Sequence, residues 1–520
     1  MPVPRPPGLS LPRPPAAAPS VPGDGPGPPP SFWPPLLPVL AALALLTRLP
    51  SLRHPCCYPD EGFVATQARM LAAGGTLYGT VVDRKPPLLP WTYEAAFALF
   101  GDQTLWPLRA AAVLAQGTTA VLLAALARRR WGERVGRTAP ILYLLVSIGL
   151  NPQDAQAANF EVFMLPWTAA ALWCADRGRW LPAGLSVAAA LLTKQTGGAV
   201  LLPVLCLLRG APARPYAPAR PYTSARPYAS VQTRAFARLR ALALLAAGLA
   251  GPLTAVALAT GPGRFLFWTV TGSAAYVSVD GSVLRAAGRA AVNAGLLAAS
   301  CAGLLVPLLM RRPGRCAGLW SWLLASAAAV TAGFHFFGHY YLQVLPPLAL
   351  LGAAALDRLP RRAARRCLAL CALSCGTFLA WGLAAGPAGL AHTRAVVAAV
   401  RGRTAATEPV LIWGMHPEQY WLAGRPPASR FLTAGLLTNF SGGRDGSRVG
   451  PRYAVPGAWT VLRRELAARP PALVLDDSRG EPYAPSRTPP LRAFLDAGYV
   501  RAGTVDGAVL YVPRPGRVPP

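Results

Sequence analysis

The chain has 520 residues, of which 53% are hydrophobic and only 14% are charged, and its mean hydropathy is +0.34. This composition excludes an ordinary soluble multidomain protein and predicts a polytopic α-helical membrane protein. The formal charge of +30 is not accompanied by a basic stripe alternating with aromatic residues, so we expect no nucleic-acid partner.

Residues 1–31 consist mostly of proline, glycine, alanine and serine. Such a segment buries too little apolar surface to offset its chain entropy, so we predict a disordered tail. The first apolar run, about 34–50, comes late and no small-residue cleavage site clearly ends it. We therefore expect this run to remain as an uncleaved membrane anchor.

Ten further apolar stretches follow the anchor, which gives about eleven transmembrane helices in a domain spanning 32–385. Several stretches are shorter than the ~20 residues that a full crossing needs. The stretch from 180 to 208 is divided into two spans at Lys194. The predicted spans after the anchor are 105–127, 138–150, 159–175, 180–193, 195–208, 239–259, 290–310, 317–334, 342–356 and 367–385.

Arginine clusters follow several of these spans and set their orientation, because basic loops stay in the cytoplasm. With 180–208 divided, the N-terminus and all the clusters lie inside and the C-terminus lies outside. If 180–208 were instead a single span, the later arginine clusters would lie outside, against the positive-inside rule. Repeated ARPY units between 209 and 238 are typical of a flexible interfacial linker. The clusters are Arg128 to Arg130, Arg311, Arg312 and Arg315, and Arg358 to Arg366.

Residues 386–520 show shorter hydrophobic runs, which predict the order strand, helix, helix, strand, helix, strand. We expect a small α/β domain outside the cytoplasm. The nine cysteines show no spacing typical of a metal site, so buried thiols are the favoured interpretation. For the adjacent Cys56 and Cys57, neither a disulfide nor a metal site can be asserted.

Adjacent carboxylates, Asp60 and Glu61, lie in the long outer loop at 51–104, where an amphipathic helix begins. One of them faces a cavity just outside the bilayer, or else an acid caps the helix. The only lysines among 51 basic residues are Lys85 and Lys194. Because lysine is a compact point charge that suits phosphate, its retention indicates a phosphate contact, with chance survival as the alternative.

Other ionisable or aromatic groups are predicted at outer span ends, where such groups mark substrate paths. An interfacial aromatic belt is the alternative for the aromatic cluster. A carboxylate at the mouth of an apolar span needs a partner, and Lys194 is the candidate for Glu161. The group comprises Glu161, Arg264, His335, His339, Tyr340 and Tyr341.

Five motifs, YPDEGF, DRKPPLLPW, LLTKQTGG, GHYYLQVLPPLALL and VLIWGMHPEQYWLAGRPPASRF, resemble the GT-C glycosyltransferases that use polyprenyl-phosphate sugars. Within that group the chain is most similar to bacterial protein O-mannosyltransferases and aminoarabinose transferases. The resemblance covers about 33–430. It implies an inverting enzyme of the cell membrane that transfers a hexosyl or pentosyl group from a lipid donor to a protein, lipid or glycan of the envelope.

The resemblance also assigns roles. Asp60 corresponds to the general base and Lys85 to the ligand of the donor phosphate, with Arg84, Lys194 or Arg264 as helpers, while Glu61 orients the acceptor or holds a divalent cation. Glu161, Lys194 and Tyr340 or Tyr341 match family positions. The alternatives are a secondary transporter or lipid flippase, which usually shows paired repeats that are not evident here, and an envelope scaffold.

Overall fold

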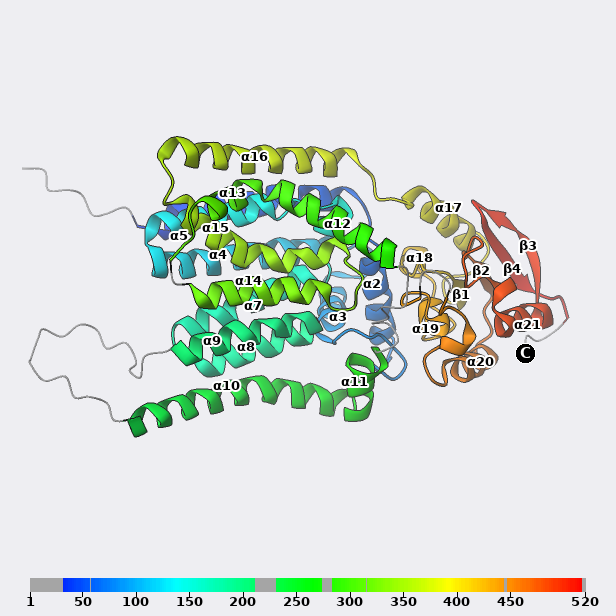
Figure 1. Cartoon of the computed structure of the whole chain (residues 1–520). Coiled ribbons are helices and arrows are strands. Elements are labelled where there is room, and N and C mark those ends of the chain that lie inside the picture. The colour runs from blue at the N-terminus through cyan, green and yellow to red at the C-terminus, as the bar shows by residue number, and fades with distance from the viewer. Residues whose placement is uncertain are drawn as a thin grey trace, which may run out of the picture.

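The computed structural model describes residues 31–56, 58–210, 231–273, 283–314, 316–443 and 447–516. The predicted tail, the ARPY repeats, Arg315 and Cys57 lie outside the described residues. Figure 1 shows a bundle of long helices with a smaller unit of strands and short helices beyond one end of the bundle.

In the described part of the chain, twelve helices occupy the eleven predicted apolar stretches, because the stretch at 290–310 is divided between two helices. They are α1 (Trp33–Arg48), α4 (Trp106–Trp131), α5 (Glu133–Val146), α7 (Phe160–Asp176), α8 (Trp180–Thr193), α9 (Leu201–Gly210), α10 (Val231–Thr260), α12 (Val283–Ser300), α13 (Ala302–Met310), α14 (Ala317–Thr331), α15 (Leu345–Leu356) and α16 (Arg361–Ala384).

Further helices lie in the connections between these apolar helices. They are η1 (Leu49–Arg53), α2 (Pro59–Ala72), α3 (Leu88–Phe100), α6 (Pro152–Gln156), η2 (Gln195–Val200), α11 (Pro262–Thr269), η3 (Thr271–Ser273) and η4 (Gly338–Val344).

Within the described residues, four helices are long and apolar enough to cross a membrane singly. They are Trp33–Arg53, Trp106–Trp131, Ala235–Thr260 and Arg361–Ala384. Helices α12 and α13 add a fifth if they form one span bent by 78°. The protein is thus a multi-helix membrane protein, while eleven crossings remain a prediction because the other apolar helices are shorter than ~20 residues.

A helix break is present at Lys194, where the sequence predicts a division between two spans. Helix α8 ends at Thr193, Lys194 has extended backbone angles (φ −153°, ψ 139°) and η2 leads into α9. Gly197 allows this turn, because a Cβ there would overlap the Ala190 carbonyl oxygen and lie 2.9 Å from the Met164 sulfur.

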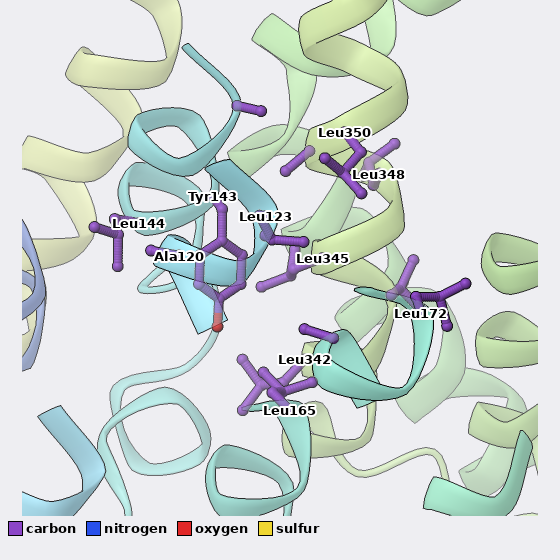
Figure 2. Close-up of a cluster of buried hydrophobic side chains, with 14 of the residues drawn as sticks. Ala120, Leu123, Tyr143, Leu144, Leu165, Leu172, Leu342, Leu345, Leu348 and Leu350 are labelled. Atoms are coloured by element: carbon purple, nitrogen blue, oxygen red, sulfur yellow. The ribbon is translucent and has the colours of Figure 1, made fainter. Parts of the chain in front are cut away.

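The core of the bundle lies where α4, α5, α7 and α15 meet (Figure 2). Small residues let some helices approach more closely, since a Cβ on Gly184 of α8 would overlap the backbone of α10. All eight cysteines in the described residues are free thiols; six are buried, as the sequence predicts, and Cys206 and Cys316 are half-buried. Core residues in Figure 2 include Ala120, Leu123, Tyr143, Leu165, Leu172, Leu345 and Leu348.

The arginine-rich helix ends gather at one end of the bundle. Arg130 pairs with Asp176 at 2.7 Å, and Arg134 pairs with Asp357 at 3.1 Å. The Arg358 guanidinium also donates to the Arg312 carbonyl. These contacts join the ends of α4, α5, α7, α13 and α15, and the strands lie beyond the opposite end (Figure 1).

The last part of the chain forms a four-stranded sheet with strand order β1-β2-β4-β3. Strands β1 and β2 are parallel, with Val410 opposite Leu473, and the other pairs are antiparallel. The elements are α17 (Leu390–Arg401), β1 (Val410–Trp413), α18 (Glu418–Ala423), α19 (Gly435–Thr438), η5 (Pro451–Tyr453), α20 (Ala458–Ala468), β2 (Leu473–Asp476), η6 (Pro485–Arg487), α21 (Pro489–Gly498), β3 (Tyr499–Val505) and β4 (Ala508–Pro513).

The predicted alternation of strands and helices is present, with one strand added. The added strand is β3, which the hydrophobic pattern of the sequence does not reveal because β3 is mostly exposed and has a bulge between Arg501 and Gly503. Asp506 and Gly507, both at positive φ, connect β3 to β4. An Asp-Gly pair between strands is a hairpin signal that the sequence did contain.

Candidate active site

The two adjacent acids of helix α2 differ in exposure: one is partly exposed and the other is buried. Tyr58 is extended and Pro59 begins the helix, so Asp60 and Glu61 fall in the first turn, where the helix dipole favours negative charge. No side chain caps this terminus, which removes the helix-cap alternative for Asp60. Successive helical residues differ by about 100° in direction, and accordingly Asp60 is partly exposed whereas Glu61 is buried.

Lys85 forms an ion pair with Asp60, with 3.1 Å between Nζ and Oδ2. Its Nζ also lies 4.4 Å from the ring centre of Phe160. Burial of Asp60 opposes ionisation, but the charges of Lys85 and then His339 hold the pKa of this carboxyl below its usual range. Both side chains remain about a third exposed, at 28% for Lys85 and 32% for Asp60, so this pair is the accessible part of the site.

A second pair, Lys194 with Glu161, lies buried behind the first. The Nζ of Lys194 is 3.8 Å from the ring centre of Tyr340. His339 Nε2 lies 3.9 Å from the Glu161 carboxylate. The structure therefore provides the partner that the sequence analysis sought for Glu161, and it adds His339 and Tyr340 to the same cluster.

Asp154 was not identified from the sequence, although it lies only seven residues before Glu161, on the short helix α6. Its carboxylate contacts His339 Nδ1 at 2.6 Å and also accepts from the His339 backbone N–H. The Tyr58 ring lies 5.5 Å from the His339 ring. His339 thus connects the Glu161–Lys194 pair to Asp154 and to Tyr58, which lies two residues before Asp60. The acid in the NPQD segment at 151–154 was the available sequence signal.

Glu61, which was predicted to orient the acceptor or to hold a divalent cation, lies in a different environment from Asp60. Its side chain is fully buried, pairs with Arg109 of α4 at 3.5 Å and accepts from the Ala158 backbone N–H at 2.7 Å. Arg109 also donates to the carbonyl groups of His54 and Pro55. Glu61 therefore joins three segments of the fold and does not face the accessible part of the site.

The two arginines predicted as helper cations, Arg84 and Arg264, have other contacts. The Arg84 carbonyl accepts from Gln195, which also donates to the Thr269 carbonyl and so ties this loop to η2 and α11. The Arg264 guanidinium lies against the turn at Gly79.

Of the two tyrosines, Tyr340 joins the cluster. The hydroxyl of Tyr341 instead donates to the Ala290 carbonyl at 3.2 Å. The His335 ring stacks on Phe337, with ring centres 5.7 Å apart.

Holding a divalent cation was one of the two roles predicted for Glu61, and the described part of the chain has no ready-made ligand set for such an ion. No group of three or more histidine, cysteine, aspartate or glutamate side chains there could hold a metal ion. The two lysines instead supply positive charge directly beside the acids.

Known proteins resemble parts of this chain in sequence and most of it in fold. Residues 84–222 match the family described as dolichyl-phosphate-mannose-protein mannosyltransferase. Two undecaprenyl phosphate-α-4-amino-4-deoxy-L-arabinose arabinosyl transferases are similar over a third of this chain. The one from Pseudomonas aeruginosa is 30% identical over 187 residues, and the one from Pseudomonas fluorescens is 31% identical over 196. The match spans about a third of the length of these relatives.

The fold resembles that of ArnT from Cupriavidus metallidurans over nearly the whole chain. The apo structure has a TM-score of 0.59 at 16% identity and covers 91% of this chain and 97% of ArnT. The structure of ArnT bound to undecaprenyl phosphate has a TM-score of 0.56 at 15% identity, covering 92% and 98%. These matches confirm the resemblance to GT-C glycosyltransferases that the sequence motifs indicate.

Proposed function

We propose that the protein is an inverting glycosyltransferase that moves a sugar from a polyprenyl-phosphate-linked donor to an envelope acceptor. The observation that carries this proposal is the partly exposed Asp60–Lys85 pair beside the buried Glu161–Lys194 pair. The similarity to transferases that use undecaprenyl-phosphate sugars supports the same donor class. A secondary transporter or lipid flippase is not favoured by these comparisons.

The proposed chemistry follows from the charges. When a phosphate leaves the anomeric carbon of the sugar, negative charge develops on that phosphate, and a fixed cation in a partly buried site stabilises it. Lys85 is the accessible cation for this role. Lys194 lies deeper and is already paired with Glu161, so it adds positive potential behind Lys85 and positions Tyr340.

Asp60 takes the acceptor's proton in this proposal. In the donor-free pair, Lys85 lowers the pKa of Asp60 and so weakens it as a base. A donor phosphate that binds Lys85 would offset this cation and raise the proton affinity of Asp60. The base would then be strengthened only when the donor is in place, and one base suffices for a single inverting displacement.

Replacement of Lys85 by arginine tests the phosphate contact. We expect Lys85→Arg to lower glycosyl transfer at least about tenfold, because a planar guanidinium cannot reproduce the point contact of an ammonium with a developing charge. The measurement is release of polyprenyl phosphate from a polyprenyl-phosphate sugar by purified protein, with expression and thermal stability compared in parallel. Arg134→Lys, at the opposite end of the bundle, is the matched control. Wild-type transfer by both Lys85→Arg and Lys194→Arg would remove the main support for this phosphate site.

The proposed topology has eleven spans, with the α/β unit at 386–520 and the site on the outer face of the cell membrane. A reporter that is active only outside the cytoplasm should therefore function when it is fused after Pro520, and the same reporter fused between 209 and 238 should be silent. The measurement is reporter activity in intact cells, normalised to expression. Activity of a strictly cytoplasmic reporter after Pro520 would contradict the proposed topology and the outer site with it.

Mass spectrometry of envelope glycans and glycoproteins tests the proposed function as a whole. A strain lacking the protein should lose one glycosyl modification, and its mass would identify both the sugar and the acceptor. An unchanged envelope combined with a changed distribution of lipid across the membrane would instead favour a flippase.

A further inference from the structure

A polar cavity lies on the other side of α2 from Asp60. Its volume is about 840 Å³, and it opens between α2, the loop after α3 and the α/β unit. Arg69 and Asp60 are nine residues apart on α2, which is two and a half helical turns. Their side chains therefore lie on opposite faces of the helix, about 14 Å apart along its axis. The cavity therefore faces away from the candidate active site.

Positive charge dominates this cavity. Among the described residues that line it, four are arginines and one, Asp102, is acidic. Asp102 is paired with Arg69 at 2.5 Å. The remaining lining arginines are Arg401, Arg425 and Arg469, and they form no ion pair with any described residue.

Two of these arginines are held in place by backbone carbonyl groups. Arg401 donates to the carbonyls of Leu422 and Ala423. Arg425 donates through all three of its guanidinium nitrogens, to the hydroxyl and carbonyl oxygens of Thr404 and to the carbonyls of Arg401, Ala423 and Gly424. These bonds fix the guanidinium groups without neutralising them. Fixed and uncompensated guanidinium groups are suited to bind a phosphate.

The cavity adjoins an apolar surface at the end of the bundle. Leu99 and Phe100 end α3 and Trp106 begins α4, and their exposed fractions are 76%, 67% and 56%. Asp102 and Gln103, which line the cavity, lie between them. Exposed apolar residues and tryptophan at the start of a membrane-spanning helix are typical of the membrane interface.

We propose that this cavity binds the phosphate-bearing headgroup of an anionic membrane lipid. Arg401 and Arg469 would contact the phosphate, and Arg425 would add positive charge beside them. The acyl chains would follow the surface formed by Leu99, Phe100 and Trp106 into the bilayer. The binding would also fix the α/β unit against α2, because the cavity is lined by residues from both. This inference does not depend on the proposed glycosyl transfer.

Lipid binding by the full chain purified in detergent tests the proposal. The probes are phosphatidylglycerol, phosphatidylcholine and inorganic phosphate, and bound species are measured by native mass spectrometry. We expect phosphatidylglycerol to bind in preference to both other probes. The double variant Arg401→Gln/Arg469→Gln should bind it about tenfold more weakly. Arg463→Gln/Arg464→Gln, on the exposed face of α20 outside the cavity, should bind as wild type does.

Arg401 also bonds to carbonyl groups of the α/β unit, so its loss can destabilise the fold. Arg469→Glu is the second variant, since the Arg469 side chain is exposed. It should lower phosphatidylglycerol binding at an unchanged unfolding temperature. Equal binding by Arg469→Glu and wild type would overturn the proposed site. Equally tight binding of inorganic phosphate would overturn the assignment to a lipid. Asp60→Asn should bind phosphatidylglycerol normally, which separates this result from any failure of glycosyl transfer.

Discussion

Asp60→Asn is expected to lower glycosyl transfer by ~10²–10⁴-fold, the usual contribution of a general base. Asparagine keeps the size of the side chain but cannot accept the proton of an acceptor hydroxyl. The helix should remain intact, because asparagine is tolerated at helix starts and no side-chain cap is lost. The measurement is turnover of a polyprenyl-phosphate sugar by the purified variant, with its thermal stability recorded beside it.

Asp357→Asn provides the matched control, because Asp357 pairs with Arg134 at the opposite end of the bundle. Its turnover should equal that of the wild type. If Asp60→Asn also turned over normally, Asp60 would not be the base. The role would not pass readily to Glu61, which is fully buried against Arg109. The partly exposed Asp154 next to His339 would then be the acid to test.

The positions of the helices could be predicted because the helices of a membrane protein are long apolar runs, which are visible directly in the sequence. The break at Lys194 was also predictable, since a lysine and two glycines interrupt an otherwise apolar stretch. The number of crossings could not be settled in this way. Several apolar helices are shorter than the bilayer core, and their orientation depends on packing against neighbours.

Part of the candidate site could be predicted because lysine is rare in this chain. Two lysines among 51 basic residues mark two ion pairs, and both lie in the candidate site. The sequence could not predict that Asp60 is partly exposed and Glu61 is buried. Which of two adjacent helical residues is buried depends on where the neighbouring helix packs. Arg109 was not identified for a different reason: an arginine in an arginine-rich chain carries little signal.

Arg109→Met is expected to destabilise the protein by about 3–5 kcal/mol, the cost of leaving one member of a buried ion pair without its partner. The Arg109 and Glu61 side chains are 1% and 0% exposed, so water cannot replace the lost guanidinium. The change also removes the hydrogen bonds to the carbonyls of His54 and Pro55 that hold the chain before α2. The measurement is thermal and denaturant unfolding in detergent, with the yield of folded protein from membranes as a second readout.

The double variant Glu61→Gln/Arg109→Met separates the charge from the packing. A neutral glutamine can still accept from the Ala158 backbone N–H, and methionine fills part of the volume of the arginine stem, so no buried charge remains. We expect the double variant to recover most of the stability lost by Arg109→Met. Because Glu61 holds α2 against α4 and does not touch substrate in this proposal, the double variant should also keep transfer within about tenfold of wild type. A folded, stable double variant without any transfer would return Glu61 to the catalytic machinery, whereas Arg109→Met with wild-type stability would show that the ion pair contributes little to the fold.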